Sequence, residues 1–254
     1  MRAATVLFAA VWGLLFGSFL NCTAMRIVRG EDWVRARSRC PKCGHTLGAE
    51  ELIPVISFLF LRGKCRSCGE KISLRYPVTE IVFGVLCALM MLRFGISVML
   101  LRSFVFACCL FVLTLTDIEA RLIPNGCLLI ALVTWFVTLP WLFAGWRDFG
   151  THIVAMIGFS VAILCLSLIM DLILKKDSLG GGDVKLIAVI ALYLGVIGTM
   201  FMLIIASLLG IGFAVVNGKF RRGTAIAFGP FLSAAGLLMA LYGEPLVAWY
   251  VSFL

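Results

Sequence analysis

The chain has 254 residues, of which 62% are hydrophobic and only 14% are charged. Soluble domains are about 45–50% apolar and about 25% charged, so this composition excludes a water-soluble globular domain and makes the bilayer the main solvent of the chain. The formal net charge of +9 does not indicate nucleic-acid binding, because 11 of the 22 Lys and Arg residues are concentrated between the first two apolar runs.

Eight apolar runs divide the chain. A membrane-spanning helix needs about 20 predominantly apolar residues, and most of the runs approach this length. They lie near 3–24, 78–97, 99–116, 127–145, 151–174, 186–198, 200–217 and 225–242. The sixth run is short, which predicts a tilted or broken helix. The expected fold class is an all-α polytopic membrane protein with about eight transmembrane helices.

The basic loop after the first run sets the predicted orientation. Arg2, the apolar run and the small residues near Ala24 also resemble a cleaved signal peptide, but cleavage would leave the basic loop outside. Loops rich in Lys and Arg stay in the cytoplasm. We therefore predict an uncleaved first helix with its N-terminus outside, and with the segments 117–125, 175–185 and 219–222 on the cytoplasmic side.

Four cysteines in the basic loop have the spacing of a metal site. Cys40 and Cys43 form one C-x2-C pair, Cys65 and Cys68 form another, and a glycine follows each pair. Four thiolates at this spacing favour a structural zinc ion, and a closed set of four ligands leaves no position for catalysis. A reducing cytoplasm argues against two disulfides, and redox chemistry remains the minor alternative. We thus expect a first transmembrane helix at 1–24, a cytoplasmic four-cysteine zinc-knuckle module at 25–77, and a transmembrane core at 78–254.

Two aspartates are predicted to meet at the cytoplasmic end of the core. Asp117 ends the third run shortly before Pro124, and Asp183 follows Gly180 and Gly182 at the start of the sixth run. Acidic residues near membrane spans tend to mark functional sites, although a single aspartate at the end of a span more often caps a helix or pairs with Lys or Arg. Glycines beside an acid favour a close, irregular approach of the backbone.

Two carboxyl groups that face one water molecule can carry out aspartic-peptidase chemistry. Like charges at close range cannot both form readily, so the pair shares one proton, and one group can act as the base while the other acts as the acid. The sequence therefore predicts a membrane aspartic endopeptidase with Asp117 and Asp183 as its catalytic pair, shaped by the backbone at Gly180, Gly182 and Pro124. Two alternatives stay open: a transporter or channel in which Asp117 and Asp183 relay protons or ions, and a scaffold that docks through the zinc module.

Several motifs resemble those of bacterial type IV prepilin peptidases, the leader peptidase/N-methyltransferases of the G-x-G-D membrane aspartic peptidase family. The matching segments span nearly the whole chain and occur in the family's order. They are Gly17–Asn21, Ser38–Cys43, Leu61–Cys65, Ile72–Pro77 with Glu80, Asp117–Asn125, Gly180–Lys185 and Phe228–Leu232.

The resemblance implies removal of the basic leader from type IV prepilins or type II secretion pseudopilins at the cytoplasmic face of the bacterial inner membrane. It also implies N-methylation of the new N-terminus with S-adenosylmethionine. The neighbourhoods of Gly17 and Glu80 are associated with this second activity in the family, so both are candidate cofactor-binding residues. The expected partners are these substrates and membrane lipid, with no nucleic acid.

Overall fold

The computed structural model describes residues 2–32, 37–142, 146–174, 180–217 and 227–253. Of the segments predicted to face the cytoplasm, 219–222 and the first part of 175–185, residues 175–179, therefore lie outside the described residues. The described residues are mainly helical, and the chain divides into two compact units, Met1–Leu100 and Leu101–Leu254. Each unit is described separately below.

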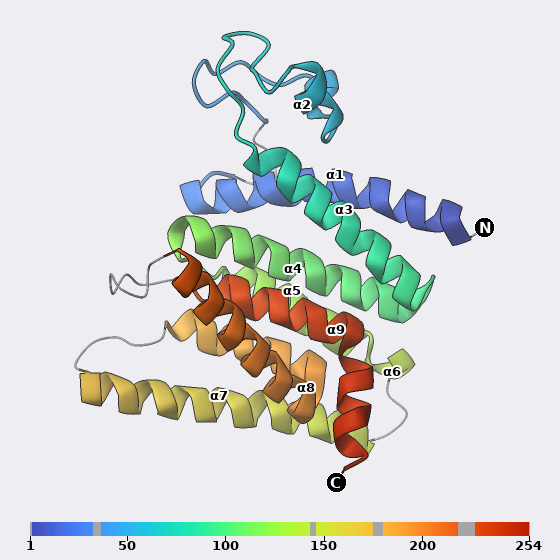
Figure 1. Ribbon diagram of the computed structural model, residues 1–254, viewed down its shortest axis with the longest axis vertical. Coiled ribbons are helices and arrows are strands. Elements are labelled where there is room, and N and C mark those ends of the chain that lie inside the picture. The colour runs from blue at the N-terminus through green and yellow to red at the C-terminus, as the bar shows by residue number, and fades with distance from the viewer. Residues whose placement is uncertain (1, 33–36, 143–145, 175–179, 218–226, 254) are drawn as a thin grey trace. The chain divides into compact units, whose positions relative to one another are not determined.

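The first unit contains two long helices and a small module between them. The helices are α1 (Arg2–Arg29) and α3 (Arg75–Phe94), and the module holds a short 3-10 helix, η1 (Ala49–Leu52), and α2 (Ile56–Phe60). Figure 1 shows α1 and α3 crossing side by side. Small residues allow this approach: a Cβ added at Gly13 would lie 2.8 Å from the Cα of Gly84. Glycine contacts of this kind are typical of helix pairs in membranes.

The second unit begins within α4 and packs five longer segments around one apolar core. Its helices are α4 (Val98–Ala120), α5 (Asn125–Val137), α6 (Leu139–Leu142), α7 (Trp146–Leu174), α8 (Gly181–Val216) and α9 (Gly229–Val251). Leu110 of α4, Ile190 of α8 and Leu232 of α9 are at most 1% exposed in this core. By contrast, much of the apolar surface of α7 is exposed, as expected of a lipid-facing helix.

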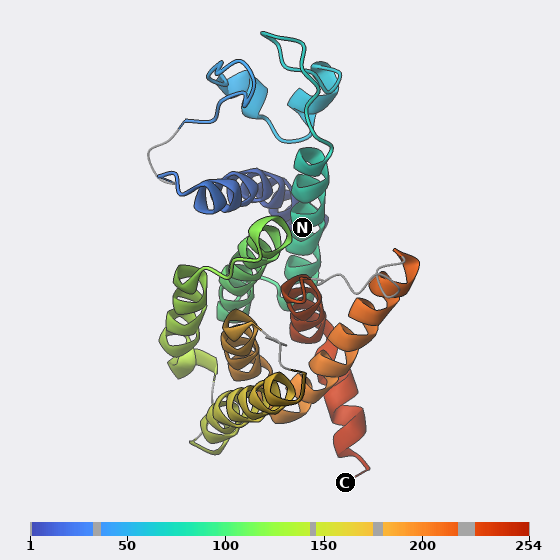
Figure 2. The same cartoon turned by 90° about the vertical axis from the view of Figure 1, so that its left-hand side faces the viewer.

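Within the described residues, most of each predicted run lies on a helix, but the runs and helices do not match one for one. Among the described residues, six helices are long and apolar enough to cross a membrane: α1, α3, α4, the part of α7 from Phe149 to Ile173, α8 and α9. The fourth run became the shorter α5, with 13 residues, followed by α6. The sixth and seventh runs both lie in α8, which is sharply bent (Figures 1 and 2).

The bend of α8 has a local cause. Gly195 has φ 69° and ψ −174°, which is a non-helical conformation that glycine adopts without a Cβ clash. Such a break frees carbonyl groups from the helical hydrogen-bond pattern. The Nδ1–H of His152 in α7 donates to the Leu192 carbonyl at 2.8 Å and satisfies one of them. The predicted break in the sixth span is therefore confirmed, and the two halves of α8 run in different directions.

Candidate functional site

Asp117 lies in the last turn of α4, with a side chain that is only 6% exposed. The helix ends just beyond it, because Arg121 has φ 52° and its N–H donates to the Asp117 carbonyl at 2.9 Å. The carboxylate oxygen Oδ2 accepts no hydrogen bond of normal geometry within the part of the chain that the structure describes, although the backbone of Gly229 lies close enough to interact with the carboxyl group. A buried carboxylate oxygen without a partner is costly, and it indicates a group kept for function.

Asp183 lies in the first turn of α8 and is half-buried. Gly180 precedes the helix with an extended backbone, and its carbonyl accepts the N–H of Asp183 at 2.9 Å. The start of a helix carries a partial positive charge, which favours a carboxylate at this position. The helix start therefore holds Asp183 at a fixed place.

Asp117 and Asp183 are carried by neighbouring segments of the second unit. Two contacts join the segments that carry them. A Cβ added at Gly182 would lie 3.1 Å from Ile123, and the Lys185 ammonium donates to Oδ1 of Asn125 at 3.3 Å. The second unit thus places the segments that carry Asp117 and Asp183 side by side, while their action as a catalytic pair stays a prediction.

The residues predicted to shape this site differ in what they do. Pro124 is the residue before α5, with φ −65° and ψ 121°, so it ends the connection from α4 and starts the next helix. Within the glycine triplet, Gly182 is packed against Ile123, whereas a Cβ on Gly181 would meet nothing within 4 Å. Gly180 has φ −67°, which any residue can adopt, and a Cβ there would make only an ordinary contact of 3.9 Å with Asp183.

Gly229, the first residue of α9, was not predicted as a site residue. A Cβ at this position would lie 2.6 Å from Oδ2 of Asp117 and 3.1 Å from its Cγ. The backbone of α9 therefore lies directly against the buried carboxyl group. The sequence gives two signals at this position, the family-like segment Phe228–Leu232 and Gly229 before Pro230 at the beginning of a helix, but neither says what the helix contacts.

The four predicted metal ligands converge in the first unit. The Sγ atoms of Cys40, Cys43, Cys65 and Cys68 all lie within 4.8 Å of one another, and those of Cys40 and Cys68 are 3.9 Å apart. Zinc with sulfur ligands at about 2.3 Å in a tetrahedron needs sulfur atoms about 3.8 Å apart. The thiol geometry therefore fits a zinc ion.

Both cysteine pairs are built in the same way. The N–H of Gly44 donates to the Cys40 carbonyl at 3.0 Å, and the N–H of Gly69 donates to the Cys65 carbonyl at 2.9 Å. The two glycines have φ +73° and +70°, so the tight turn at each pair needs the residue without a Cβ. The repeated C-x2-C-G pattern in the sequence thus folds into two tight turns of the same geometry, the two knuckles, one at each cysteine pair.

Two of the four thiols, Cys40 and Cys68, differ in acidity. Backbone N–H groups of Cys43 and Lys42 lower the pKa of the Cys40 thiol to about 6. At Cys68 the N–H of Glu70 acts in the same direction, but burial and the neighbouring thiols outweigh it and raise the pKa to about 11. The Cys40 thiolate is therefore readily available to a cation, and binding of the cation would be needed to ionise Cys68.

Removal of one thiol is expected to release the metal. Cys43→Ser leaves three sulfur ligands, so the purified protein should lose most of its zinc and its basic loop should be cut faster by trypsin, because closure of the knuckles depends on the ion. Zinc per chain is measured by atomic emission. Cys165→Ser, an exposed thiol of α7, is the matched control. Equal zinc content in Cys43→Ser and Cys165→Ser would contradict a four-thiolate site.

The two candidate cofactor residues, Gly17 and Glu80, lie side by side where α1 crosses α3. A Cβ on Gly17 would be 3.0 Å from the Cα of Glu80. Glu80 is 6% exposed, and its Oε2 accepts the N–H of Val55 at 2.7 Å. The structure thus gives Gly17 a close helix contact and Glu80 a bond to the module, while their part in cofactor binding stays a prediction.

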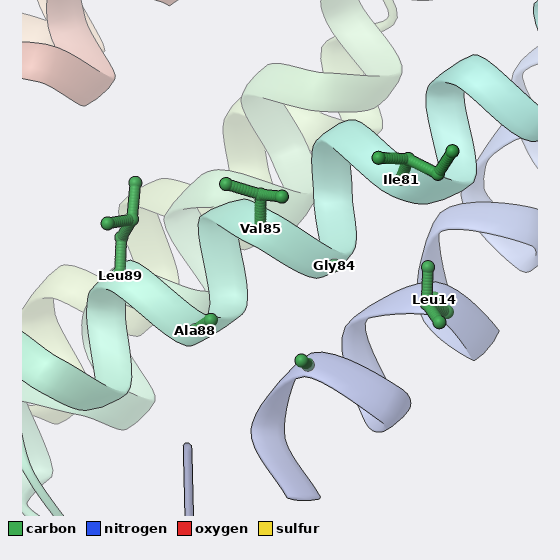
Figure 3. Close-up of a pocket in the computed structure, with 7 residues that line it drawn as sticks. Leu14, Ile81, Gly84, Val85, Ala88 and Leu89 are labelled. Carbon is green, nitrogen blue, oxygen red and sulfur yellow. The ribbon is translucent and has the colours of Figure 1, made fainter. Parts of the chain in front are cut away.

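A nearby groove on this helix pair does not supply a cofactor site. Figure 3 shows it along α3, lined by Leu14, Ile81, Gly84, Val85, Ala88 and Leu89, together with Ala10. These residues offer no polar side chain. A cofactor with charged and hydrogen-bonding groups would lose its hydration there without replacement, so the groove suits an acyl chain or another apolar group.

Comparison with known proteins agrees with the geometry. Residues 11–94 match the bacterial peptidase A24 N-terminal domain, and residues 104–215 match the type IV leader peptidase family. A prepilin leader peptidase/N-methyltransferase of Bacillus subtilis (strain 168) is 36% identical over 95% of this chain and 96% of its own length. Proteins of the same name from Dichelobacter nodosus and Neisseria gonorrhoeae are 33% and 30% identical, over 94% and 91% of this chain and 92% and 88% of theirs.

No solved structure matches the chain. The two family matches, 11–94 and 104–215, fall within the two compact units, so each unit corresponds to one conserved part of the relatives. The identities extend over almost the whole length of both this chain and its relatives, which confirms the resemblance seen in the motifs. The chain belongs to the type IV leader peptidase family.

Proposed function

We propose that this protein removes the basic leader from type IV prepilins or type II secretion pseudopilins and then N-methylates the new N-terminus. The observation that supports the peptidase activity is the contact of Gly182 with Ile123, which joins the segments of Asp183 and Asp117, together with the burial of the Asp117 carboxyl group. A transporter or channel would also use buried carboxylates, but no described feature favours it over a peptidase, and the relatives are named as peptidases.

In peptide hydrolysis one carboxyl group acts as the base and the other as the acid. The ionised one takes a proton from water as the water oxygen attacks the scissile carbonyl carbon, and the protonated one donates to the carbonyl oxygen. In the second step the C–N bond of the gem-diol breaks, the first group gives its proton to the leaving amine, and the second group takes back a proton from a gem-diol hydroxyl as the carboxylic acid forms. Because the pair titrates as a unit, neither aspartate is assigned permanently as acid or base.

The proposed orientation places this chemistry at the cytoplasmic face of the bacterial inner membrane, with the N-terminus outside. It rests on the basic loop between the first two apolar runs. The same charges favour anionic lipid over nucleic acid as the contact of the loop. We retain the division into a first helix at 1–24, a zinc module at 25–77 and a peptidase core at 78–254 as part of this proposal.

S-adenosylmethionine is the methyl donor in this proposal, which draws on the names of the relatives. Among the described residues of the first unit, Gly17 and Glu80 are engaged with each other's helix and with Val55, and the adjoining groove is apolar. Neither these contacts nor this groove offers polar groups to the charged cofactor, so we assign no step of methylation to particular residues.

The purified full-length protein should release the leader from a prepilin that retains its apolar helix. The reaction is run in nanodiscs with S-adenosylmethionine, and the mass of the product N-terminus is read. Leader release with the added mass of one methyl group supports both activities. Release without that mass supports the peptidase alone. If neither a prepilin nor a pseudopilin is cut, the peptidase proposal is wrong, and proton flux in liposomes tests the transporter instead.

A further inference from the structure

A ten-residue apolar segment, Leu52–Leu61, lies between the two knuckles of the zinc module and includes α2. Ser57 is its only hydrophilic side chain. Within this apolar segment the side chains of Ile56, Leu59 and Phe60 are 50%, 67% and 84% exposed. Large neighbouring apolar groups left open in this way mark a surface that another apolar phase covers.

The length of the apolar segment helps to decide whether the covering apolar phase is protein or lipid. A run of about 10–14 apolar residues is too short to cross a bilayer and is typical of a buried core helix or of an interfacial segment. Its exposed side chains exclude the first of these. The module also stays next to the membrane, because α3 begins at Arg75, shortly after the second knuckle.

A hydrogen bond fixes the depth of the apolar segment. The Val55 N–H, at the start of α2, donates to Oε2 of Glu80 at 2.7 Å. Glu80 lies five residues after Arg75, or about 7–8 Å along α3 at about 1.5 Å per residue. On the same stretch of α3, Val78 and Ile81 are exposed and apolar. The start of α2 is thus level with the first lipid-facing turns of the spanning helix.

The hydrogen bond between Val55 and Glu80 also stabilises an unfavourable backbone conformation at Val55. Val55 has φ 60° and ψ −47°, a conformation that is rare for a β-branched residue. Strained residues of this kind persist only where the surrounding structure over-determines them. The buried Glu80 carboxylate supplies that constraint, so the position of the apolar segment is imposed by the fold.

Basic side chains flank the apolar segment. Arg62, Lys64 and Lys71 are exposed, and the structure shows no ion pair for any of these three, whereas Arg66 pairs with Glu50 and Lys42 pairs with Glu70. Apolar groups beside unpaired cations are the pattern of a surface that lies in the headgroup layer of an anionic membrane. A basic leader peptide would instead be repelled by the same charges.

We infer that Leu52–Leu61 is an interfacial anchor that inserts into the lipid headgroup layer and holds the zinc module against the bilayer. Ile56, Leu59 and Phe60 enter the apolar boundary, and Arg62, Lys64 and Lys71 contact anionic headgroups. The choice of the cytoplasmic leaflet rests on the proposed orientation of the chain. The insertion itself does not depend on peptidase activity.

Photo-crosslinking in lipid tests this anchor. The full-length protein is prepared with p-benzoylphenylalanine in place of Phe60, which is similar in shape and 84% exposed, so that folding is preserved. The control carries the same probe at Ser67, an exposed polar position on the second knuckle. Both are placed in nanodiscs of phosphatidylethanolamine and phosphatidylglycerol, irradiated, and analysed by mass spectrometry.

The expected result is a phospholipid adduct at position 60 and none above background at position 67, with phosphatidylglycerol over-represented relative to its share of the bilayer. Absence of lipid adduct at position 60 overturns the proposal, and adducts that merely follow bilayer composition overturn the headgroup contacts. Prepilin is added in a second arm. Transfer of the adduct from lipid to prepilin would show that the apolar segment binds substrate instead. The lipid arm needs no turnover, so it is independent of the proposed activity.

Discussion

Replacement of Asp117 or Asp183 by asparagine is expected to lower the rate of leader cleavage roughly 10³-fold or more. Positioned acid and base groups contribute about 10²–10⁴-fold each, and an amide can neither accept the proton of water nor donate one to the carbonyl oxygen. Because the two carboxyl groups act as one unit, the double variant should be hardly slower than either single variant. Single-turnover cleavage of a purified prepilin measures all three rates.

Two controls separate lost chemistry from lost folding. Asparagine has nearly the volume of aspartate, so the melting temperature of each variant in detergent should stay close to that of the unchanged protein. Methylation of a pilin whose leader has already been removed should also continue. If a single variant still cleaves at a normal rate, the aspartate that it replaces is not part of the catalytic pair. A double variant far slower than both single variants would indicate that the two aspartates act independently.

Gly229→Ala is expected to lower kcat of cleavage about 100-fold with a much smaller change in KM. The new Cβ would lie 2.6 Å from Oδ2 of Asp117, well inside van der Waals contact, so the carboxyl group must move. A misplacement of up to 1 Å at a reacting group can cost about 100-fold in rate. Steady-state kinetics with a purified prepilin gives both constants.

Gly181→Ala provides the matched control for this variant. Gly181 and Gly229 are each the first residue of a helix, neither has a positive φ, and a Cβ on Gly181 would meet nothing within 4 Å. The control should therefore cleave at nearly the normal rate, although it adds the same methyl group next to the other aspartate motif. Equal kcat values for the two variants would show that the contact of Gly229 with Asp117 does not position the carboxyl group.

The local features of this protein follow from the sequence because they depend on neighbouring residues. The spacing of Cys40, Cys43, Cys65 and Cys68 predicts the converging thiols, since each C-x2-C-G unit closes on itself through backbone hydrogen bonds. The short sixth run likewise predicts the break in α8, which occurs at Gly195. Alternation of the eight predicted spans also predicts that Asp117 and Asp183 lie at the same end of the core, and this placement stays a prediction because α5 is shorter than a full span.

Tertiary packing alone decided which residues surround those aspartates. The three glycines before Asp183 look equivalent in sequence, yet only Gly182 is pressed against Ile123. Gly229 lies more than a hundred residues from Asp117, and its contact arises from the way α9 packs within the second unit. Hydrophobic periodicity and helix signals report what each helix buries and where it begins, but a close approach between two distant backbones depends on the packing of whole helices, which no local pattern encodes.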